Sequence, residues 1–346
     1  MKCTVAISGG TDSLYALLSL REQGCSVEAL HARFLPPSAE NDPVPALQRL
    51  CDSLGIPLHV ADLSQAFRKH VMEPFALAHA AARTPNPCAL CNRAMKFGLL
   101  MDEGLKYGDA YATGHYAALA EHPSYGPALR AGSDSAKDQS YFLALVPPER
   151  LRRCVFPLAG VCKADARAWL AERGMEPPLP SESQEICFIP GDDHCAWLEQ
   201  QKATGLNLSG EGPVVLAGQG KVIARHRGLW QYTEGQRHGL RIAWSEPLYV
   251  LRRHAASNTL FVGPKGMLRE NSCTASQLNI MVEPRLWPEQ VFARTRYRQR
   301  PVPAEVRIEG DAMNITFRTP QAPHAPGQVA AVYDGEGFVL AGGILD

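Results

Sequence analysis

The sequence lacks several features that would place the protein at a membrane or outside the cell. No apolar run reaches the roughly 18 residues that a membrane-spanning helix needs, so we expect no membrane contact. The start, MKCTVAISGG, is typical of a strand and not of a charged and then apolar signal peptide. Basic and acidic residues number 35 each, so a nucleic-acid surface would have to be a local patch. We expect a cytoplasmic protein.

The sequence also lacks a second C-x-x-C pair. Its ten cysteines, in the cytoplasm, would be mostly reduced thiols, so clustered ones are more often catalytic or metal-binding than structural disulfides. Cys88 and Cys91 form one C-x-x-C, which alone fits a redox pair or half of a zinc site. The histidines are scattered along the chain, which argues against structural zinc.

The single C-x-x-C pair has basic neighbours. Pro85 and Pro87 indicate an extended approach to the start of a helix, on which Arg93 and Lys96 follow. A helix N-terminus and nearby cations both stabilise a thiolate, so we expect lowered pKa values for these thiols. A third cysteine, Cys187, lies in the loop-flanked stretch SESQEICFIPGDD.

The pattern of elements changes along the chain of 346 residues, which exceeds the usual size of one domain. Up to about Gly114, short apolar strands alternate with helices, which predicts an α/β, Rossmann-like domain with a parallel sheet and helices on both faces. The expected strands are residues 2–8, 26–34, 56–64 and 109–117. The expected helices include 11–24, 44–55 and one that begins near Lys163.

From Gly210 onward the chain consists of short alternating strands and tight turns. This pattern predicts a small β-rich central domain followed by a C-terminal β-barrel. We place the domain boundaries at 1–205, 206–264 and 265–346.

The junction between the first strand and the first helix reads SGGTDS, from Ser8 to Ser13. A helix N-terminus offers unpaired N–H groups and a partial positive charge, which favour an anion. The loop has no lysine and so is not a Walker-type loop. Its glycines would instead let backbone N–H groups surround a pyrophosphate, and Asp12 could hold Mg²⁺. The plain alternative is a strand–helix turn capped by Thr11 or Ser13.

The SGGTDS string resembles the PP-loop of the ATP pyrophosphatases. Members of that superfamily cleave ATP between the α and β phosphates and adenylate a substrate oxygen. The resemblance therefore implies ATP as a cosubstrate. It leaves the adenylated group open, because PP-loop enzymes act on nucleotides, amino acids and RNA.

Further motifs make a narrower resemblance. They are TPNPCALCNRAMKF, ATGHYA, KDQSYFL, SQEICFIPG, GLWQYTEGQRHGL and RTRYRQ, in this order. The chain resembles, over essentially its full length, the tRNA-specific 2-thiouridylases of the MnmA/TrmU family. The resemblance implies thiolation at C2 of the wobble uridine, position 34, in tRNAs for Lys, Glu and Gln. ATP adenylates the C2 oxygen, and a cysteine persulfide then delivers the sulfur. The resemblance also implies a sulfur donor as partner, either a persulfide-carrying protein or sulfide.

The resemblance assigns roles to individual positions. Cys187 becomes the persulfide carrier. Cys91 becomes the nucleophile, the second cysteine that helps release the sulfur as a disulfide forms. The ATP site would comprise Ser8, Gly9, Gly10, Thr11, Asp12, Ser13, Phe34 and Gly114. The target base would meet Asn86 and Pro87. Contacts to tRNA would come from Lys137, Asp138, Gln139, Arg296 and Tyr297.

Cys88 is a departure from the family, which usually has Asp at this position. The change removes a carboxylate and supplies a third thiol. Cys88, Cys91 and Cys187 could together hold three irons of a [4Fe–4S] cluster, whose fourth iron would bind sulfide. The alternative is a neutral replacement that leaves the persulfide route intact. Smaller departures are Thr11 for Val, the lack of Arg after Ala117, and Glu234 for Ile.

Two groups of basic residues extend the expected tRNA surface. Arg294, Arg296, Arg298 and Arg300 alternate, and on a strand their side chains would share one face that follows phosphates. A solvated surface without a ligand is the alternative. A second basic group lies in the central domain, at Arg225, His226, Arg227, Arg237 and His238.

Other functions remain open at this point. One is a PP-loop enzyme that thiolates tRNA at another position, or a ligase or amidotransferase that adenylates a small metabolite. ATP–pyrophosphate exchange without RNA would favour the metabolite enzyme, although it gives no role to KDQSYFL or to the barrel. Another is a non-catalytic RNA-binding protein, against which the intact loop and cysteines argue.

Overall fold

The computed structural model describes residues 1–37, 42–179 and 186–346. Its first part is built on a five-stranded sheet in which every pairing is parallel and the strand order is β3-β2-β1-β4-β7. The strands are β1 (Lys2–Ala6), β2 (Ser26–Arg33), β3 (Leu58–Asp62), β4 (Ala110–Ala112) and β7 (Cys154–Val155). The predicted strands and their parallel arrangement are thus confirmed.

Helices cover both faces of this sheet, because side chains alternate along a strand. Cys3 and Val5 of β1 share a core with Leu17 of α1 (Thr11–Glu22), together with residues of α2 (Val44–Leu54) and α9 (Lys163–Glu172). On the opposite face, Thr4 Oγ1 donates a 2.8 Å hydrogen bond to the carbonyl of Gly104 in α6 (Leu100–Gly104). The predicted helices that begin at residues 11, 44 and 163 are all present.

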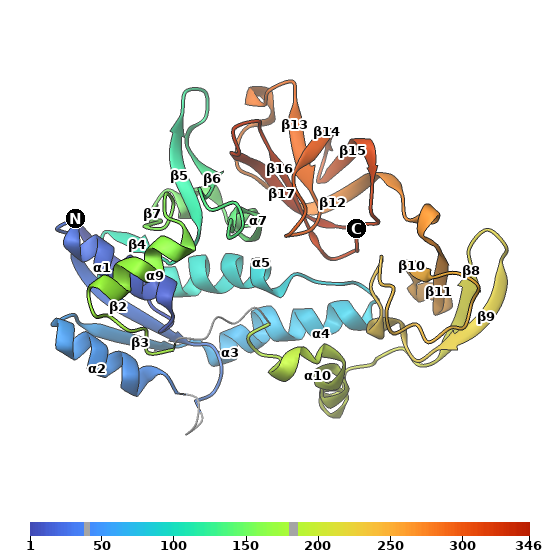
Figure 1. Cartoon of the computed structure of the whole chain (residues 1–346), viewed down its shortest axis with the longest axis horizontal. Coiled ribbons are helices and arrows are strands. Elements are labelled where there is room, and N and C mark those ends of the chain that lie inside the picture. Colours follow the sequence, from blue (N-terminus) through green and yellow to red (C-terminus); the bar gives the residue numbers. More distant parts are fainter. Residues whose placement is uncertain (38–41, 180–185) are drawn as a thin grey trace.

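A row of helices leads from the sheet toward the other two domains. In Figure 1, α4 (Glu73–Ala80) and α5 (Pro87–Cys91) run across the middle of the molecule, with the barrel above them and the central domain at their far end. Across the described ranges, no helix is both long and apolar enough to cross a membrane. The remaining elements of this part are α3 (Ser64–Phe67), η1 (Arg68–Met72), α4 (Glu73–Ala80), α5 (Pro87–Cys91), η2 (Asn92–Leu99), β5 (Ala117–His122), β6 (Gly126–Ala131), α7 (Ser140–Leu143), α8 (Pro148–Leu151), η3 (Pro190–Asp192), α10 (His194–Gln201) and η4 (Lys202–Thr204).

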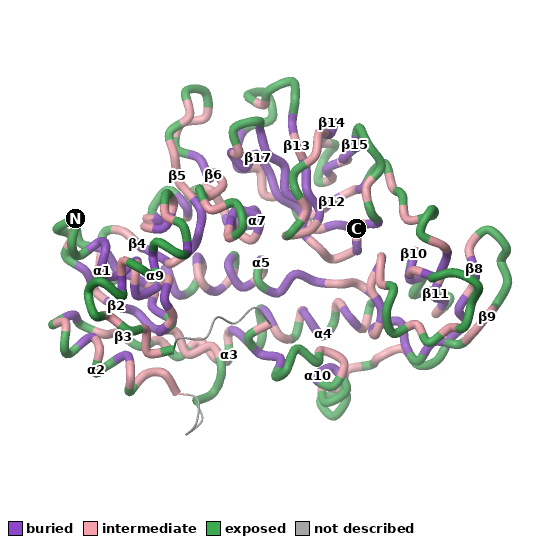
Figure 2. Tube along the Cα trace, viewed as in Figure 1, coloured by how far each residue is buried: buried purple, intermediate pink, exposed green. Residues whose placement is uncertain are grey.

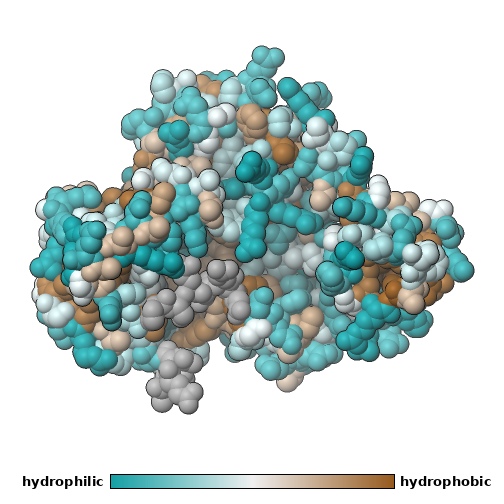
Figure 3. Space-filling model, viewed as in Figure 1, coloured by the Kyte–Doolittle hydropathy of each residue, from teal (hydrophilic) through white to brown (hydrophobic). Residues whose placement is uncertain are grey.

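The central domain is a four-stranded sheet in the order β10-β11-β8-β9. Its strands are β8 (Gly212–Leu216), β9 (Lys221–His226), β10 (Leu248–His254) and β11 (Thr259–Pro264), with the short helices η5 (Leu229–Gln231), η6 (Ala255–Ser257) and η7 (Lys265–Met267). Figure 3 shows apolar residues gathered at the end of the molecule where this sheet lies.

The C-terminal part is a closed barrel in the order β12-β15-β14-β13-β16-β17, as predicted. Its strands are β12 (Glu270–Ile280), β13 (Val291–Arg294), β14 (Val302–Glu309), β15 (Ala312–Gln321), β16 (Val329–Tyr333) and β17 (Val339–Leu345), and η8 (Pro284–Leu286) joins the first two. Its core is apolar, β16 is buried along its whole length, and Figure 2 shows the buried stretch of β17. The boundaries at 205 and 264 remain our proposal.

Candidate active site

The SGGTDS loop lies at the carboxyl end of β1, where the chain turns into α1. Gly9 adopts a φ of +90°, which a residue with a side chain rarely takes. Gly10 is the N-cap residue of α1, and among the described residues no side chain caps the first turn. Ser13 Oγ instead donates to the Gly10 carbonyl at 2.9 Å and accepts from the backbone N–H of Ser8 at 3.1 Å. The capped-turn alternative is therefore wrong, and the helix start keeps its N–H groups for an anion.

Gly114 packs directly against this turn. A Cβ at this position would lie 2.7 Å from the Asp12 carbonyl carbon and 2.8 Å from the Ser13 nitrogen, closer than real Cβ contacts. Glycine is thus required because the two backbones touch. The structure brings the two parts of the predicted ATP site together.

Asp12 has two partners that the sequence did not indicate. Tyr116 donates its hydroxyl to Asp12 Oδ1 at 2.7 Å, and Lys163 Nζ lies 2.6 Å from the same oxygen. Lys163 comes from the first turn of α9 and its side chain is only 8% exposed. The sequence marked Lys163 as the start of a helix, but nothing in its spacing linked it to the loop.

The two ends of the predicted ATP site differ in their surroundings. Leu179 covers Gly9: its N–H donates to the Gly9 carbonyl at 2.9 Å, and its side chain would lie 3.2 Å from a Cβ on Gly9. Phe34 follows β2 and stacks on Phe67 with ring centroids 5.1 Å apart. It thus lies at the carboxyl edge of the sheet, where ligands of parallel sheets bind, and its contact with adenosine stays a prediction.

The C-x-x-C pair lies on α5, as predicted. Asn86 caps this helix by accepting a 3.1 Å hydrogen bond from the Ala89 N–H, and Pro87 occupies the first helical position. Cys88 is exposed, whereas Cys91 is buried on the inner side of the helix. The helix continues into the π-helix η2, which carries Lys96.

The structure brings Cys187 to the same place. Cys91 belongs to an apolar cluster that includes Phe188 and Ile189 and against which Ile186 packs, so the chain on both sides of Cys187 contacts the core around Cys91. The three thiols are close enough to perturb one another electrostatically. Ser183 and the other residues of this motif before Ile186 lie outside the described residues.

The expected lowering of the thiol pKa values is wrong. Burial raises the pKa of Cys91 to about 12, and it also raises those of Cys88 and Cys187. Water reaches the two exposed thiols, but protein atoms surround most of each sulfur, and this desolvation outweighs the opposing charge of Lys96. Lys96, and not Arg93, is the basic residue whose charge lowers these thiol pKa values. The desolvation that accompanies the packing of residues 186–189 therefore changes the thiol pKa values more than the nearby positive charge does.

The three thiols are not grouped as ligands of a single metal ion. Over residues 1–37, 42–179 and 186–346, no three His, Cys, Asp or Glu side chains are grouped as one such ion would require. A [4Fe–4S] cluster on Cys88, Cys91 and Cys187 stays a prediction, and we derive no step through one.

The segment before the cysteines is held by both other domains. The Thr84 N–H donates to the Pro326 carbonyl at 2.6 Å, and Gln328 Nε2 donates to the carbonyls of Thr84 and Pro85. Arg253 of β10 donates through Nη2 to Thr84 Oγ1 at 2.8 Å. Arg253 is itself fully buried and ion-paired with Glu234, with 2.7 Å between Nη2 and Oε2. Glu234, which stands where the family usually has Ile, thus supports through Arg253 the segment that precedes the cysteines.

The prediction that four arginines share one face of a strand is wrong, because only Arg294 lies on a strand and its side chain is buried. Strand β13 ends at Arg294, and residues 295–299 form turns, so the arginines do not share one face. Arg294 is buried and donates through Nη2 to Asp138 Oδ2 at 2.8 Å and to the Tyr333 hydroxyl at 2.7 Å. Arg298 and Arg300 are exposed, so the surface that could follow phosphates is smaller than predicted.

The predicted tRNA contacts are partly engaged within the chain. Asp138 is buried and also accepts from the N–H and hydroxyl of Ser140. Gln139 Oε1 accepts from the N–H of Tyr116 at 2.9 Å. Arg296 donates to the Glu234 carbonyl at 3.1 Å, and Tyr297 packs on Phe142 with centroids 4.3 Å apart. Lys137 is half-buried beside them. These residues bring the barrel, the central domain and the catalytic domain together.

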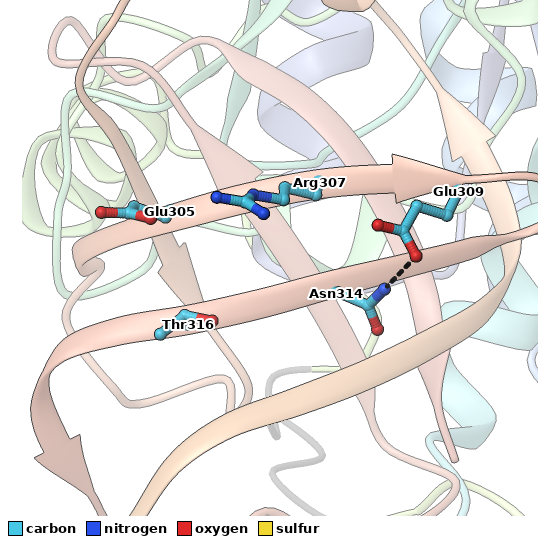
Figure 4. Close-up of a pocket in the computed structure, with 5 residues that line it drawn as sticks. All are labelled: Glu305, Arg307, Glu309, Asn314 and Thr316. Atoms are coloured by element: carbon cyan, nitrogen blue, oxygen red, sulfur yellow. Dashed lines mark hydrogen bonds between the residues drawn. The ribbon is translucent and has the colours of Figure 1, made fainter.

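A polar hollow of about 340 Å³ lies elsewhere, on the barrel. Figure 4 shows its lining side chains along two neighbouring strands, which the pairing identifies as β14 and β15. None of the residues predicted to bind ATP, tRNA or sulfur lines it, so we assign it no role. The lining residues are Glu305, Arg307, Glu309, Asn314 and Thr316.

Comparisons with known families match all three parts of the chain. The model of the tRNA methyl transferase HUP domain matches residues 1–191. The model of the tRNA methyl transferase PRC-barrel domain matches residues 204–264, and that of the aminomethyltransferase beta-barrel domain matches 270–345.

Similar curated proteins match over their whole length. The chain is 53% identical to the tRNA-specific 2-thiouridylase MnmA of Oleidesulfovibrio alaskensis, covering 100% of this chain and 99% of that protein. It is 51% identical to the one of Nitratidesulfovibrio vulgaris (strain DSM 19637 / Miyazaki F), with the same coverage. Among solved structures, the U34-tRNA thiolase NcsA from Methanococcus maripaludis with its [4Fe-4S] cluster is 15% identical over 59% of this chain and 66% of its own. Its TM-score of 0.36 is too low to support an argument about the site.

Proposed function

Because the chain belongs to the tRNA-specific 2-thiouridylase family, we propose how its residues carry out the reaction. The protein is a sulfurtransferase that uses ATP to replace the C2 oxygen of uridine 34 in tRNA with sulfur. The observation that carries the proposal is the convergence of Cys91 and the Cys187 segment in one apolar cluster at the end of α5.

The first step activates the uridine. The C2 oxygen attacks the α-phosphorus of ATP, an O–P bond forms, and pyrophosphate leaves with the electrons of the broken P–O bond. The open turn at Gly9, Gly10 and Thr11 supplies N–H donors for the phosphates, and Gly114 closes the turn from the other side. Asp12 is the carboxylate that would hold Mg²⁺ beside them, which would neutralise phosphate charge.

The second step transfers sulfur. The terminal sulfur of a persulfide on Cys187 attacks C2, and AMP leaves with the former C2 oxygen. The Cys91 thiolate then attacks the Cys187 sulfur, so that the S–S bond to the base breaks and its electrons remain on the new thiocarbonyl. The products are 2-thiouridine and a Cys91–Cys187 disulfide, which a dithiol reductant must reduce before the next cycle.

The position of the two thiols suits this division of roles. Exposed Cys187 can receive the outer sulfur of a donor's persulfide, and the donor keeps a thiol; we propose that this donor is a persulfide-carrying protein. Buried Cys91 is protected from oxidation and reacts only when a disulfide-like adduct forms beside it. Lys96 is the cation that favours both thiolates.

The substrate must reach this site with its base unstacked, because the C2 oxygen is not accessible in a stacked anticodon loop. We propose that Asn86 and Pro87 contact the flipped base and that Arg296, Tyr297 and Lys137 contact the surrounding tRNA. The tRNAs would be those for Lys, Glu and Gln. All ten cysteines are free thiols, which supports a cytoplasmic location.

The test is to compare modified nucleosides in tRNA from cells with and without the gene, and then to add the purified protein, ATP and a sulfur donor to the unmodified tRNA. We expect 2-thiouridine at position 34 to disappear with the gene and to return in vitro. ATP–pyrophosphate exchange on a small metabolite without tRNA, or thiolation at another position, would contradict the proposal. Iron and sulfide content after anaerobic purification tests the cluster. A fully active, iron-free protein would exclude the cluster, and the persulfide route would then be the only one of the two that remains.

A further inference from the structure

A lysine from a distant part of the chain lies beside the phosphate loop. Lys163 Nζ is 2.6 Å from Asp12 Oδ1, although 151 residues separate the two in sequence. Asp12 is the second residue of α1, next to the N–H groups that face the expected phosphates. SGGTDS itself contains no cation, so the loop offers the triphosphate only neutral donors.

The surroundings hold the ammonium group of Lys163 in this place. Its side chain is 8% exposed, and its own backbone N–H donates to Asp134 Oδ2 at 3.0 Å, which fixes the start of α9. The Tyr116 hydroxyl donates to the same Asp12 oxygen at 2.7 Å and so limits the movement of the carboxylate. A buried lysine is seldom retained without a partner or a function, because desolvation of its charge is costly.

We infer that Lys163 binds the β and γ phosphates of ATP and neutralises the pyrophosphate as it leaves. The inference rests on the proposed function, since it concerns the same adenylation step. As the bond between the α-phosphorus and the bridging oxygen breaks, negative charge grows on the departing pyrophosphate. An ammonium group that is already oriented stabilises that charge without reorganisation. Asp12 holds Lys163 in place before ATP arrives.

A purely structural role for Lys163 is the alternative, since its ion pair joins α1 to α9. The chain offers a matched control for that role. Arg173, which caps the far end of α9, pairs with Glu22, the last residue of α1, with 2.7 Å between Arg173 Nε and Glu22 Oε1. Ion pairs therefore connect the two parallel helices at both ends, and only the Lys163–Asp12 pair lies at the phosphate loop.

The experiment compares Lys163→Met, Lys163→Arg and Arg173→Met in the full-length protein. Three quantities are measured: tRNA-dependent pyrophosphate release, calorimetric binding of α,β-methylene-ATP, and thermal unfolding. We expect Lys163→Met to lower kcat/KM for ATP about 100-fold or more and to weaken analogue binding at least tenfold, as loss of one oriented charged donor does. Lys163→Arg should recover part of the binding, and Arg173→Met should behave as wild type.

Each outcome separates the inference from its alternatives. If Lys163→Met binds the analogue and releases pyrophosphate as wild type does, or if Arg173→Met loses the same activity, the inference is wrong. If Lys163→Met fails to fold, Lys163→Gln, which keeps a polar side chain without the charge, is measured in its place: a folded variant with unchanged KM for ATP and unchanged analogue binding contradicts a phosphate contact. A wild-type protein that releases no pyrophosphate with tRNA would instead contradict the proposed function.

Discussion

Arg294 of the barrel and Asp138 of the catalytic domain form a buried ion pair across 156 residues of sequence, with 2.8 Å between Nη2 and Oδ2. Their side chains are 8% and 9% exposed, and the Arg294 guanidinium also lies over the rings of Tyr141 and Tyr333. The pair joins two motifs, KDQSYFL and RTRYRQ, that the sequence suggested only as tRNA contacts.

Arg294→Met should therefore destabilise the protein. It leaves Asp138 as a buried charge without its cation, which typically costs about 3–5 kcal/mol of unfolding free energy. Denaturant unfolding of the full chain measures the change. Arg298→Met is the control: this exposed side chain should leave stability unchanged and weaken tRNA binding in a salt-dependent manner. Equal unfolding midpoints for the two variants would contradict a structural role for Arg294.

Glu234→Ile restores the residue that the family usually has, yet we expect it to be harmful here. It leaves Arg253, whose side chain is 0% exposed, without its carboxylate partner, at a cost of about 3–5 kcal/mol. Because Arg253 also holds Thr84, the variant should slow thiolation as well. The double variant Glu234→Ile with Arg253→Met removes both charges and should regain most of the stability. A double variant no more stable than Glu234→Ile would show that the pair is not coupled.

Gly114→Ala should impair the use of ATP. The added Cβ would lie 2.7 Å from the Asp12 carbonyl carbon, so the phosphate turn has to move. A displacement of this kind at a binding turn should raise KM for ATP tenfold or more, with tRNA affinity unchanged. Gly160→Ala is a matched control, since a Cβ at that position meets nothing within 4 Å. A wild-type KM for ATP in Gly114→Ala would mean that ATP binding does not depend on this turn.

The sulfur-transfer step should accelerate as pH rises. Burial raises the pKa of Cys91 to about 12, so near pH 7 only a small fraction is thiolate, and that fraction grows tenfold per pH unit. The single-turnover rate should follow this slope between about pH 6.5 and 8.5. Lys96→Met removes the charge that opposes the shift and should slow the step about tenfold, whereas Lys106→Met, on an exposed lysine, should not. A rate independent of pH would show that Cys91 does not act as a thiolate in the slow step.

Local patterns were sufficient to predict the sheet, the barrel and the cysteine-bearing helix. Strand period, loop glycines and the turn at Ser8 to Ser13 depend on neighbours within a few residues, and the structure confirms them. The family resemblance located Cys187 near Cys91, which no spacing rule could do.

Long-range contacts were not predictable in the same way. Lys163 meets Asp12, and Arg253 meets Glu234 and Thr84, only because the fold brings separate elements together. The thiol pKa values were predicted in the wrong direction, because sequence shows charged neighbours but not the packing of Phe188 and Ile189 that desolvates the site. Arg294 was placed on a surface because alternation in sequence does not show where a strand ends.

A single-turnover experiment tests the sulfur relay most directly. The protein is loaded by a small-molecule persulfide donor, freed of excess donor, and mixed with ATP and unmodified tRNA without reductant. The relay predicts one Cys91–Cys187 disulfide, measured by peptide mass spectrometry, for each 2-thiouridine formed, and neither product in Cys91→Ser or Cys187→Ser, while Cys273→Ser behaves as wild type. Formation of 2-thiouridine with both thiols still reduced would contradict it.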